Sequence, residues 1–332
     1  MGPTRTPGRS ELRCEADAII RRVNGRAGPL CACLLALAAC RQQAPASSRI
    51  PPDRPSAAAG RVLTLGDIDP DTPALKLERI EPLARYLAPE LAAVGVSDVR
   101  IRIAPSIDRM IELLNAGEVD VYLDSLYPTL QVRQRSGSRI ILRTWVGDLP
   151  EYHSMFIARR DGGVRKLSDL TDRVIAFEEP HSTSGFFLPA LHLRRGGHPV
   201  DELDSADARP EAGAIGYVFS GDAENTVERV LRGSVAAGAI SNEDYDALSE
   251  AGRARLRVLS RTISIPRRLV SVRRGLPEAV TRALSVALVA VAEKEPVVLE
   301  DALRAWSWKC DPLTPDVVAA IEQLATSIVE PD

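Results

Sequence analysis

The sequence predicts an α/β protein of two lobes, each a mostly parallel sheet flanked by helices, with a ligand cleft between the lobes. Residues 61–123 alternate apolar runs with helical patterns in a β-α-β-α-β order, which favours parallel strands joined by right-handed crossovers. Two later apolar segments, 152–157 and 256–269, are placed to cross between lobes. The 332 residues, 45% of them hydrophobic, suffice for two lobes.

The elements of the first lobe are predicted from the spacing of apolar residues and from the glycine and proline residues that mark helix ends. Apolar and polar side chains alternate along residues 98–103, as in a strand. The helix predicted at 107–116 ends at Gly117. The apolar pattern of 75–91 is helical, but Pro82 makes Glu81-Pro82 the expected start. The predicted elements are strands at 61–66, 98–103, 119–123 and 139–146, and helices at 81–91, 107–116 and 130–135.

The chain is then expected to enter a second lobe and return. Residues 152–158 form the strand that crosses over, and 269–272 rejoins the first lobe. The predicted boundaries are 61–153 plus 262–332 for lobe I and 154–261 for lobe II. The remaining predicted elements are strands at 173–177, 214–219 and 256–259, and helices at 186–195, 226–232, 277–292 and 315–328.

The N-terminus is predicted to be a targeting segment. Arg21, Arg22 and Arg26 precede an apolar stretch at 27–39 that is too short to span a bilayer but typical of a signal peptide. Its end, Leu-Ala-Ala-Cys at 37–40, resembles the lipobox of bacterial lipoproteins. That resemblance implies a signal peptide at 1–40, acylation of Cys40 and a tether at 41–60. An ordinary signal peptide is the alternative, and translation could start near Val23.

Charge and cysteine content exclude several functions. The net charge is −3, and removal of the first 40 residues leaves 36 basic against 42 acidic residues, so nucleic acid is not an expected partner. An anion binder with such a surface would have to concentrate positive potential in its cleft. Only Cys310 remains beyond the lipobox, so no internal disulfide can form. The histidines are scattered and no metal or cofactor is expected.

The chain is organised around 177–185, where a buried strand is followed by Ser182, Thr183 and Ser184 and then by a helix. A helix N-terminus offers free backbone N–H groups and the positive end of the helix dipole, which suits an oxyanion. These three hydroxyls are therefore predicted ligand contacts. The alternative is that one hydroxyl caps the helix and the others contact solvent.

The loop after the strand 119–123 is the next candidate, because ligands of such sheets bind beyond the carboxyl ends of the strands. Ser125 and Tyr127 are predicted donors. Asp124, an acceptor beside an anion site, either points away or receives a proton or amine from the ligand.

The pattern F-x-x-P-x-S-T-S-G-x-x-x-P at 177–189 resembles the anion-binding loop of the phosphonate/phosphite/phosphate group of periplasmic solute-binding proteins, which serve ABC importers. Lys-Leu-Ser-Asp-Leu at 166–170 and Asn-Ala-Gly-Glu-Val-Asp-Val at 115–121 support the resemblance, as do 219–221 and 232–239. It extends from about Val62 to Pro277 and implies a type II-like periplasmic-binding-protein fold.

Departures from that family bear on the ligand. The family carries an acid for an amino group where this chain has Arg267 and Arg268, which trades amine recognition for anion recognition. Solvated surface arginines are the alternative. Where the family has a ligand-touching histidine this chain has Ala223, and we take the neighbouring Glu224 as a ligand contact.

The resemblance implies a non-enzymatic, monomeric lipoprotein on the extracytoplasmic side of a membrane. It would close on a small anion (phosphate, phosphite or phosphonate) and deliver it to an ABC permease. One alternative is a sensor subunit that docks on a histidine kinase. Another is an enzyme on the same scaffold, although His181 beside Ser182 is not in itself a catalytic arrangement.

Overall fold

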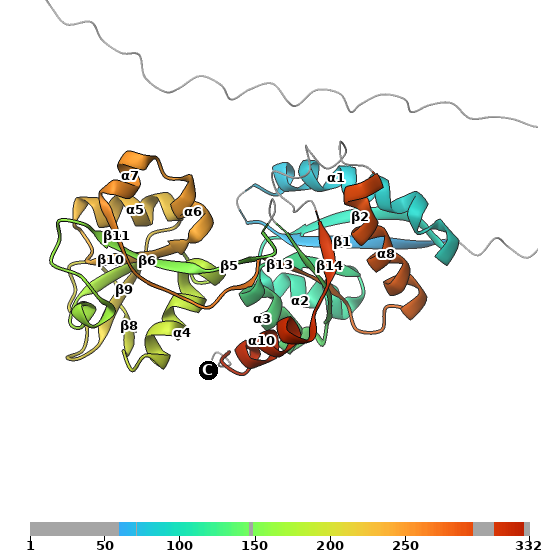
Figure 1. The fold of residues 1–332 in the computed structure, drawn as a ribbon. Helices are drawn as coiled ribbons and strands as arrows, with labels where there is room; N and C mark the ends of the chain where they lie inside the picture. The colour runs from blue at the N-terminus through green and yellow to red at the C-terminus, as the bar shows by residue number, and fades with distance from the viewer. Residues whose placement is uncertain (1–59, 71, 146–148, 295–308, 329–332) are drawn as a thin grey trace, which may run out of the picture. The chain divides into compact units, whose positions relative to one another are not determined.

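The computed structural model describes residues 60–70, 72–145, 149–294 and 309–328. The predicted signal peptide, the tether and Cys40 lie outside these residues. The described chain forms two six-stranded sheets and one two-stranded sheet, with helices packed on both faces of each large sheet (Figure 1). Among the helices of the described ranges, none combines the length and apolar character that a membrane crossing requires.

The first sheet has the strand order β14-β4-β13-β3-β1-β2. Strands β1, β2 and β3 are parallel, whereas β13 is antiparallel to both β3 and β4, and β14 is antiparallel to β4. The sheet is therefore mixed, with its parallel half built from the early chain as predicted. Its strands are β1 Arg61–Ile68, β2 Val96–Ala104, β3 Val121–Asp124, β4 Arg139–Thr144, β13 Arg268–Val272 and β14 Cys310–Pro312.

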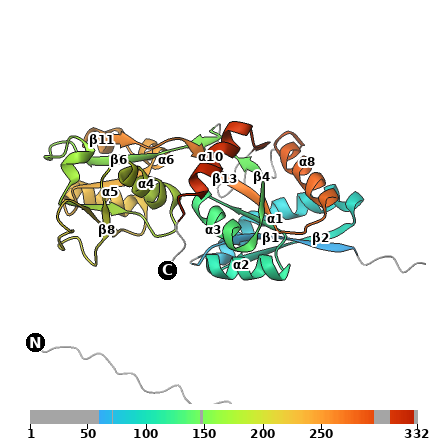
Figure 2. The ribbon, with the colours of Figure 1, turned by 90° about the horizontal axis from the view of Figure 1, so that it is seen from below.

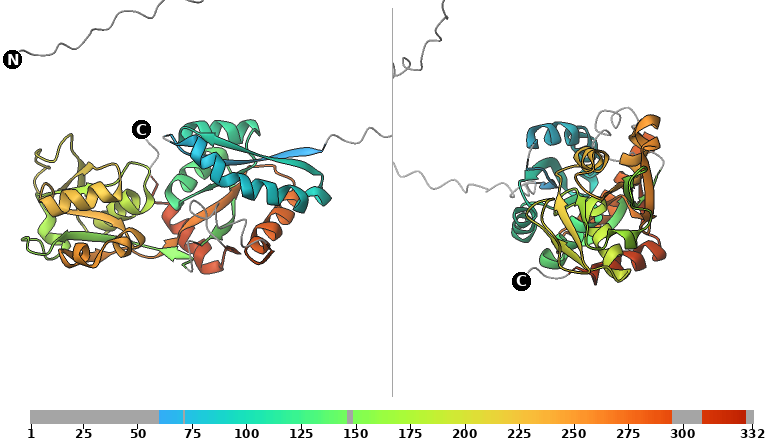
Figure 3. Two further views of the ribbon diagram at one scale, coloured as in Figure 1. Left: turned by 90° about the horizontal axis from the view of Figure 1, so that it is seen from above. Right: turned by 90° about the vertical axis from the view of Figure 1, so that its left-hand side faces the viewer.

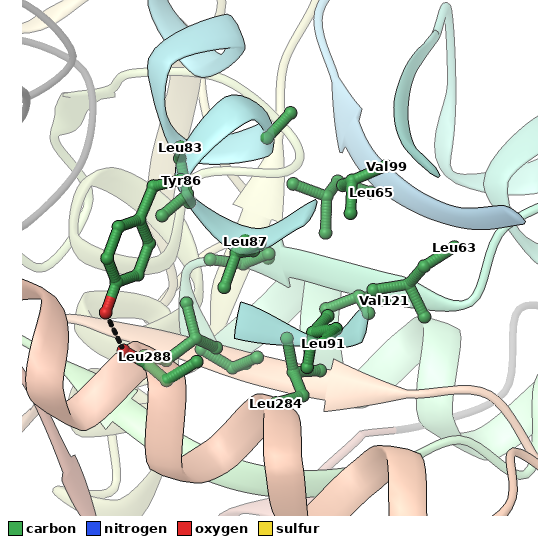
Figure 4. Close-up of a cluster of buried hydrophobic side chains, with 14 of the residues drawn as sticks. Leu63, Leu65, Leu83, Tyr86, Leu87, Leu91, Val99, Val121, Leu284 and Leu288 are labelled. Carbon is green, nitrogen blue, oxygen red and sulfur yellow. Dashed lines mark hydrogen bonds between the residues drawn. The ribbon is translucent and has the colours of Figure 1, made fainter. Parts of the chain in front are cut away.

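Helices cover both faces of this sheet. One apolar core packs α1 and α8 against β1, β3 and β13, and a second packs α2 and α3 on the opposite face (Figures 1 and 2). In the first core the Tyr86 hydroxyl donates to the carbonyl of Ala287 at 3.2 Å and ties α1 to α8 (Figure 4). The helices are α1 Pro73–Glu90, η1 Ala92–Val94, α2 Ile107–Ala116, α3 Leu126–Ser136, α8 Glu278–Lys294 and α10 Pro315–Ala325.

Helix α1 corrects the prediction that a helix starts at Glu81-Pro82. It begins at Pro73 and continues through Pro82. A proline inside a helix removes one N–H donor and usually kinks or ends the helix. Here Ile80, Leu83 and Leu87 are buried in the core on either side of Pro82, so packing outweighs the lost hydrogen bond.

The second sheet has the strand order β11-β6-β10-β7-β9-β8. Strands β10, β7, β9 and β8 are parallel neighbours, whereas β6 is antiparallel to both β10 and β11. The central strand β10, Ala-Gly-Ala-Ile-Ser, was not predicted, because it has too few bulky apolar residues to look like a strand. Its strands are β6 Ser154–Arg159, β7 Val174–Phe177, β8 Val200–Glu202, β9 Ile215–Phe219, β10 Ala237–Ser241 and β11 Leu256–Arg261.

Alternating side chains of these strands make two cores. Phe156 and Phe177 lie in the cluster with α4, whereas Ile157 and Ala176 lie in the cluster with α5. Because both faces are buried, the strands are continuously apolar, as their sequences predict. The helical segments are η2 Leu167–Leu170, the π-helical turn Thr183–Phe187, α4 Leu188–Arg195, α5 Ala223–Arg232, α6 Asn242–Ala247 and α7 Glu250–Ala254.

The chain passes between the lobes at the segments predicted to cross. The short strands β5 Glu151–Tyr152 and β12 Ile265–Pro266 pair antiparallel and lead into β6 and β13. The first lobe consequently combines early and late parts of the chain, which appear in blue to green and in orange to red (Figure 3). The domain boundaries themselves remain a prediction.

Candidate functional site

A cavity of about 490 Å³ lies beyond the carboxyl ends of β2, β3, β7 and β10 and is lined from both lobes. This is the end of the strands at which α/β sheets bind ligands. The lining residues are Ile68, Pro70, Lys76, Pro105, Ser106, Ile107, Asp124, Ser125, Pro128, Tyr152, Glu178, Glu179, His181, Ser182, Thr183, Ser184, Ser241, Asp244, Arg267 and Arg268.

Several helices begin at this cavity, each introduced by a serine that lines it. Ser106 caps α2 and accepts from the Arg109 N–H at 3.2 Å, and Ser125 precedes α3. Ser182 caps the π-helical turn that continues into α4, and Ser241 caps α6. Each helix start leaves backbone N–H groups without an intrahelical partner and carries a partial positive charge. The cavity is therefore surrounded by donors and dipoles suited to an anion.

The Ser182-Thr183-Ser184 loop lines the cavity, and its hydroxyls already make hydrogen bonds within the protein, so their contact with a ligand remains a prediction. The Ser182 hydroxyl accepts from the Gly185 N–H at 2.9 Å and donates to Oε2 of Glu178 at 2.8 Å. Ser182 is therefore both the cap of this helical segment and a residue of the cavity lining, two roles that the sequence presented as alternatives. The backbone N–H groups at this helix start remain the natural donors to an anion.

Thr183 joins the two lobes at the cavity. Its hydroxyl donates to the Ser125 hydroxyl at 3.0 Å and accepts from the Tyr127 N–H at 2.9 Å, and its side chain is only 2% exposed. Tyr127, a predicted donor to the ligand, is not part of the lining. Its ring stacks on Phe187 at 4.4 Å and belongs to the apolar packing behind the loop.

Asp124 lines the cavity with both oxygens already accepting hydrogen bonds. The Tyr122 hydroxyl donates to Oδ2 at 2.7 Å and the Ser125 N–H donates to Oδ1 at 2.6 Å. Burial, together with the Asp124 charge, raises the pKa of Tyr122 well above its ordinary value, so the phenol remains a donor. Of the two expectations for Asp124, this arrangement favours a carboxylate turned toward its own lobe.

The basic side chains of the first lobe share one buried acid. Lys76 Nζ lies 3.3 Å from Oδ1 of Asp67, and Nη1 of Arg268 lies 4.0 Å from Oδ2. Asp67 is 1% exposed, and burial raises its pKa to about 6 against the lowering charges of Lys76 and Arg268. Its Oδ2 and Nη1 of Arg268 are buried without a hydrogen-bond partner.

Arg267 also departs from the alternative of a solvated arginine. Its Nε donates to Oε2 of Glu243 at 2.7 Å, and the guanidinium carbon lies 4.5 Å from the centre of the Tyr152 ring. Burial raises the pKa of Tyr152, opposed by the Arg267 charge and by hydrogen bonding with the Ser184 and Thr183 side chains. Arg267 therefore stabilises the part of the cavity wall, at Tyr152, against which the Ser182-Thr183-Ser184 loop packs.

The positive potential expected in the cleft is not matched by a surplus of basic side chains in the lining. Three basic residues (Lys76, Arg267 and Arg268) face four acidic ones (Asp124, Glu178, Glu179 and Asp244). Each of the three basic side chains also contacts a carboxylate. The helix N-termini, rather than a surplus of basic side chains, supply the positive potential.

Glu224, another predicted ligand contact, lies away from this cavity. It lies in the first turn of α5 with an exposed side chain and is not among the lining residues. The cavity uses the strand ends of β7 and β10, whereas α5 follows β9, which lies on the far side of β7 from β10. The loop after β9 is consequently one strand away from the site.

Sequence reasoning missed the contributions of Lys76, Glu178, Ser241 and Asp244. Ser241 and Asp244 follow the unrecognised strand β10, so no strand end drew attention to them. Lys76 lies in the part of α1 that was assigned to a loop before Pro82. A complete strand assignment would have indicated Ser241, because it has the same position relative to its strand as Ser182 and Ser125.

Comparison with known proteins identifies solved structures that are similar to this chain. The protein XAC2383 from Xanthomonas citri, solved bound to chloride ion, is 32% identical over 80% of this chain and 96% of its own, with a TM-score of 0.74. The same protein solved bound to ATP gives 31% identity over the same shares and a TM-score of 0.73. A search of proteins with curated functions found no match.

More distant structures share the fold. PhnD1 from Prochlorococcus marinus, solved in complex with methylphosphonate, is 16% identical over 80% of this chain and 97% of its own, with a TM-score of 0.58. Residues 68–311 match the family described as the ABC transporter, phosphonate, periplasmic substrate-binding protein. The chain therefore belongs to this family of periplasmic substrate-binding proteins of ABC transporters, which is not a family of enzymes.

Proposed function

We propose that the protein captures a small phosphoryl or phosphonyl oxyanion in the cavity between its lobes and delivers it to an ABC permease. The observation that carries the proposal is the meeting of the N-termini of α2, α3 and the helical segment 183–195 at one cavity. These N-termini supply fixed N–H donors and dipoles to a bound oxygen without adding side-chain charge.

The cavity volume and the relatives support an anion with an organic part. A volume of about 490 Å³ exceeds what a single tetrahedral anion fills and falls in the range of ligand pockets. Relatives of this chain have been solved with methylphosphonate and with ATP, both of which carry phosphorus-bound oxygens. Inorganic phosphate and phosphite remain within the class, because lobe closure would reduce the space.

A thermal-shift screen of the purified protein tests this proposal. The probes are phosphate, phosphite, methylphosphonate, ATP, sulfate and acetate, each at several concentrations. A ligand at one hundred times its Kd adds about 2.7 kcal/mol to the free energy of unfolding, which raises the melting temperature measurably. Stabilisation by phosphorus oxyanions over acetate is expected, and no response to any of them would contradict the proposal.

Delivery is separable from capture. Reconstituted with an ABC permease that recognises it, the loaded protein should stimulate ATP hydrolysis, and the ligand-free protein should not. Stimulation of a histidine kinase in place of a permease would instead make the protein a sensor subunit.

We also propose that Cys40 is lipidated and holds the protein at the membrane, supported by the Leu-Ala-Ala-Cys sequence at 37–40 after an apolar run. Cys40→Ala should release the protein from the membrane fraction or block its maturation. Cys310→Ala is the matched control, since this buried thiol lies in β14. Unchanged membrane partition of Cys40→Ala after washing would remove the proposed anchor.

A further inference from the structure

One acidic side chain of the cavity has an arrangement that simple anion binding does not explain. Glu178 follows β7 directly and folds back against the loop, where Oε2 accepts from the Ser182 hydroxyl at 2.8 Å. A Cβ atom placed on Gly185 would lie 2.2 Å from the carboxyl carbon of Glu178. The carboxyl therefore packs against the start of the helix that is proposed to hold the anion, and Gly185 makes the space for it.

The second oxygen of this carboxyl is unpaired. Oε1 of Glu178 is shielded from solvent and has no hydrogen-bond partner, although the residue lines the cavity. A buried polar oxygen without a partner is unfavourable, and more so when it carries charge. The unpaired Oε1 is satisfied either by a ligand group that donates a hydrogen bond to it or by a proton bound to it.

The surroundings of Glu178 favour its neutral form. Burial raises its pKa to about 7, the hydrogen bond from Ser182 opposes this, Asp244 of α6 and Glu179 raise it further, and Arg267 lowers it. His181, on the same loop, also lines the cavity. An oxyanion bound beside this carboxyl adds a second negative charge, and two such groups in one site favour sharing one proton.

We propose that Glu178 is the specificity-determining residue of the cavity: in the complex its Oε1 and an oxygen of the bound oxyanion share one proton. This inference rests on the proposed function, because it requires an oxyanion in the same cavity. The proton comes from solvent, from the protonated carboxyl or from a monoanionic ligand, and the complex is the same in each case. A charge-assisted O–H···O⁻ bond of this kind is short and about twice as strong as a neutral one.

The inference makes proton uptake part of binding. Above the pH at which both Glu178 and the free ligand are ionised, each binding event removes one proton from solution. The apparent Kd then rises about tenfold for each pH unit, which is the linkage expected for one proton. A ligand held only by N–H donors would show no such dependence.

Calorimetric titration of the purified protein with methylphosphonate tests this. At about pH 8.5, where this ligand is predominantly a dianion, titrations in two buffers of different ionisation enthalpy give the number of protons taken up. We expect a value near one, and a Kd that rises about tenfold between about pH 8 and pH 9. Uptake near zero with binding intact would overturn the inference while leaving the proposed function in place.

Two variants locate the proton. Glu178→Gln keeps the shape and offers a permanent N–H donor, so proton uptake should fall to near zero and the pH dependence of Kd should flatten. Glu179→Gln removes a neighbouring charge on an exposed residue of the same cavity and should shift Kd by the same factor between about pH 8 and pH 9, with uptake still near one. Uptake that persists in Glu178→Gln, or is lost in Glu179→Gln, would refute the assignment.

Two further outcomes are decisive. If Glu178→Gln does not fold, the proton count of the unaltered protein still decides the question, because it needs no variant. If 2-aminoethylphosphonate binds more than tenfold tighter than methylphosphonate without proton uptake, Oε1 pairs with an ammonium group and proton sharing is wrong. If no oxyanion binds at any pH from about 6 to 9, the proposed function fails and this inference with it.

Discussion

The two walls of the cavity offer an anion different kinds of positive charge. The wall from the first lobe presents Lys76 and Arg268, but both contact the buried Asp67. The wall from the second lobe presents the start of the helical segment 183–195, with the Glu178 carboxyl packed beneath it. The first wall is a balanced ion cluster, and the second is a set of backbone donors.

This difference indicates that the two walls contribute in different ways to recognition of the anion. Backbone N–H groups at a helix start are fixed in place and need no counterion, so a ligand gains their full interaction. Lys76 and Arg268 must share their charge between Asp67 and the ligand, which reduces the gain. We infer that the second wall selects the oxyanion and that the first wall completes the charge balance.

Removal of Arg268 should have the largest effect, because it alters both the ion cluster and the ligand contact. Arg268→Ala should destabilise the fold by about 1–3 kcal/mol, since Asp67 keeps only Lys76 as a partner. It should also raise Kd for phosphate or methylphosphonate by about tenfold or more. Chemical denaturation and calorimetric titration measure the two effects.

The control for this variant is Arg194→Ala, since Arg194 is exposed in the last turn of α4 and does not line the cavity. It should leave Kd unchanged. An equal loss of affinity in both variants would mean that Arg268 acts only through the net charge of the protein.

Asp67 provides a pH test of the first wall. Burial raises the pKa of Asp67 from 3.8 to about 6, so the fold favours the neutral acid. The stability contributed by the neutral acid is present below about pH 4 and is lost as the pH rises through about 6. The free energy of unfolding of the parent protein should therefore fall by up to about 3 kcal/mol between pH 4 and pH 7. Asp67→Asn should remove this fall. Denaturation curves across this range measure it.

The same variant sharpens the comparison of the walls. With asparagine at 67, Lys76 and Arg268 no longer share their charge with a carboxylate, so phosphate should bind more tightly at pH 7. Weaker binding would show instead that Asp67 is needed to orient the two basic side chains.

Thr183→Ala should weaken binding with a smaller effect on stability. The Thr183 hydroxyl links the starts of α3 and the 183–195 helix through Ser125 and the Tyr127 N–H. Loss of this link should raise Kd about tenfold, whereas the lost hydrogen bonds account for about 1–2 kcal/mol of stability. Thr171→Ala, which removes a hydroxyl bonded to the Ser168 carbonyl, is the control. If Thr183→Ala binds as the parent does, the loop is only a helix cap.

The sequence predicted the second wall better than the first. Ser182 and its neighbours were found because a buried strand, a run of hydroxyls and a helix follow one another within a few residues, and all of that information is local. Arg267 and Arg268 were found through a family resemblance. The role of Asp67 could not be found in this way, because it depends on the approach of α1 and β13 to β1, which are far apart in the chain.

The errors have specific physical causes. Glu224 was chosen from its place after a strand, but it lies outside the cavity lining because the order of strands in the sheet decides which loops reach the cavity. Tyr127 was chosen as a donor, but stacking on Phe187 takes its ring into the apolar packing. Pro82 was taken as a helix start, although burial of Ile80 and Leu83 keeps the helix continuous.

Ligand-dependent closure of the lobes is the smallest expected effect. The paired crossing strands β5 and β12 are the connection at which a hinge would act. Small-angle scattering should give a smaller radius of gyration with saturating ligand than without it. Equal radii would mean that the cavity binds its ligand without closure.

A crystal structure of the protein with methylphosphonate would locate the anion relative to the two walls. We expect phosphonate oxygens within about 3.2 Å of backbone N–H groups at the start of the 183–195 helix. One of these oxygens should also contact Oε1 of Glu178. A phosphonate bound to Lys76 and Arg268 alone, with the 183–195 helix start left to water, would contradict this expectation.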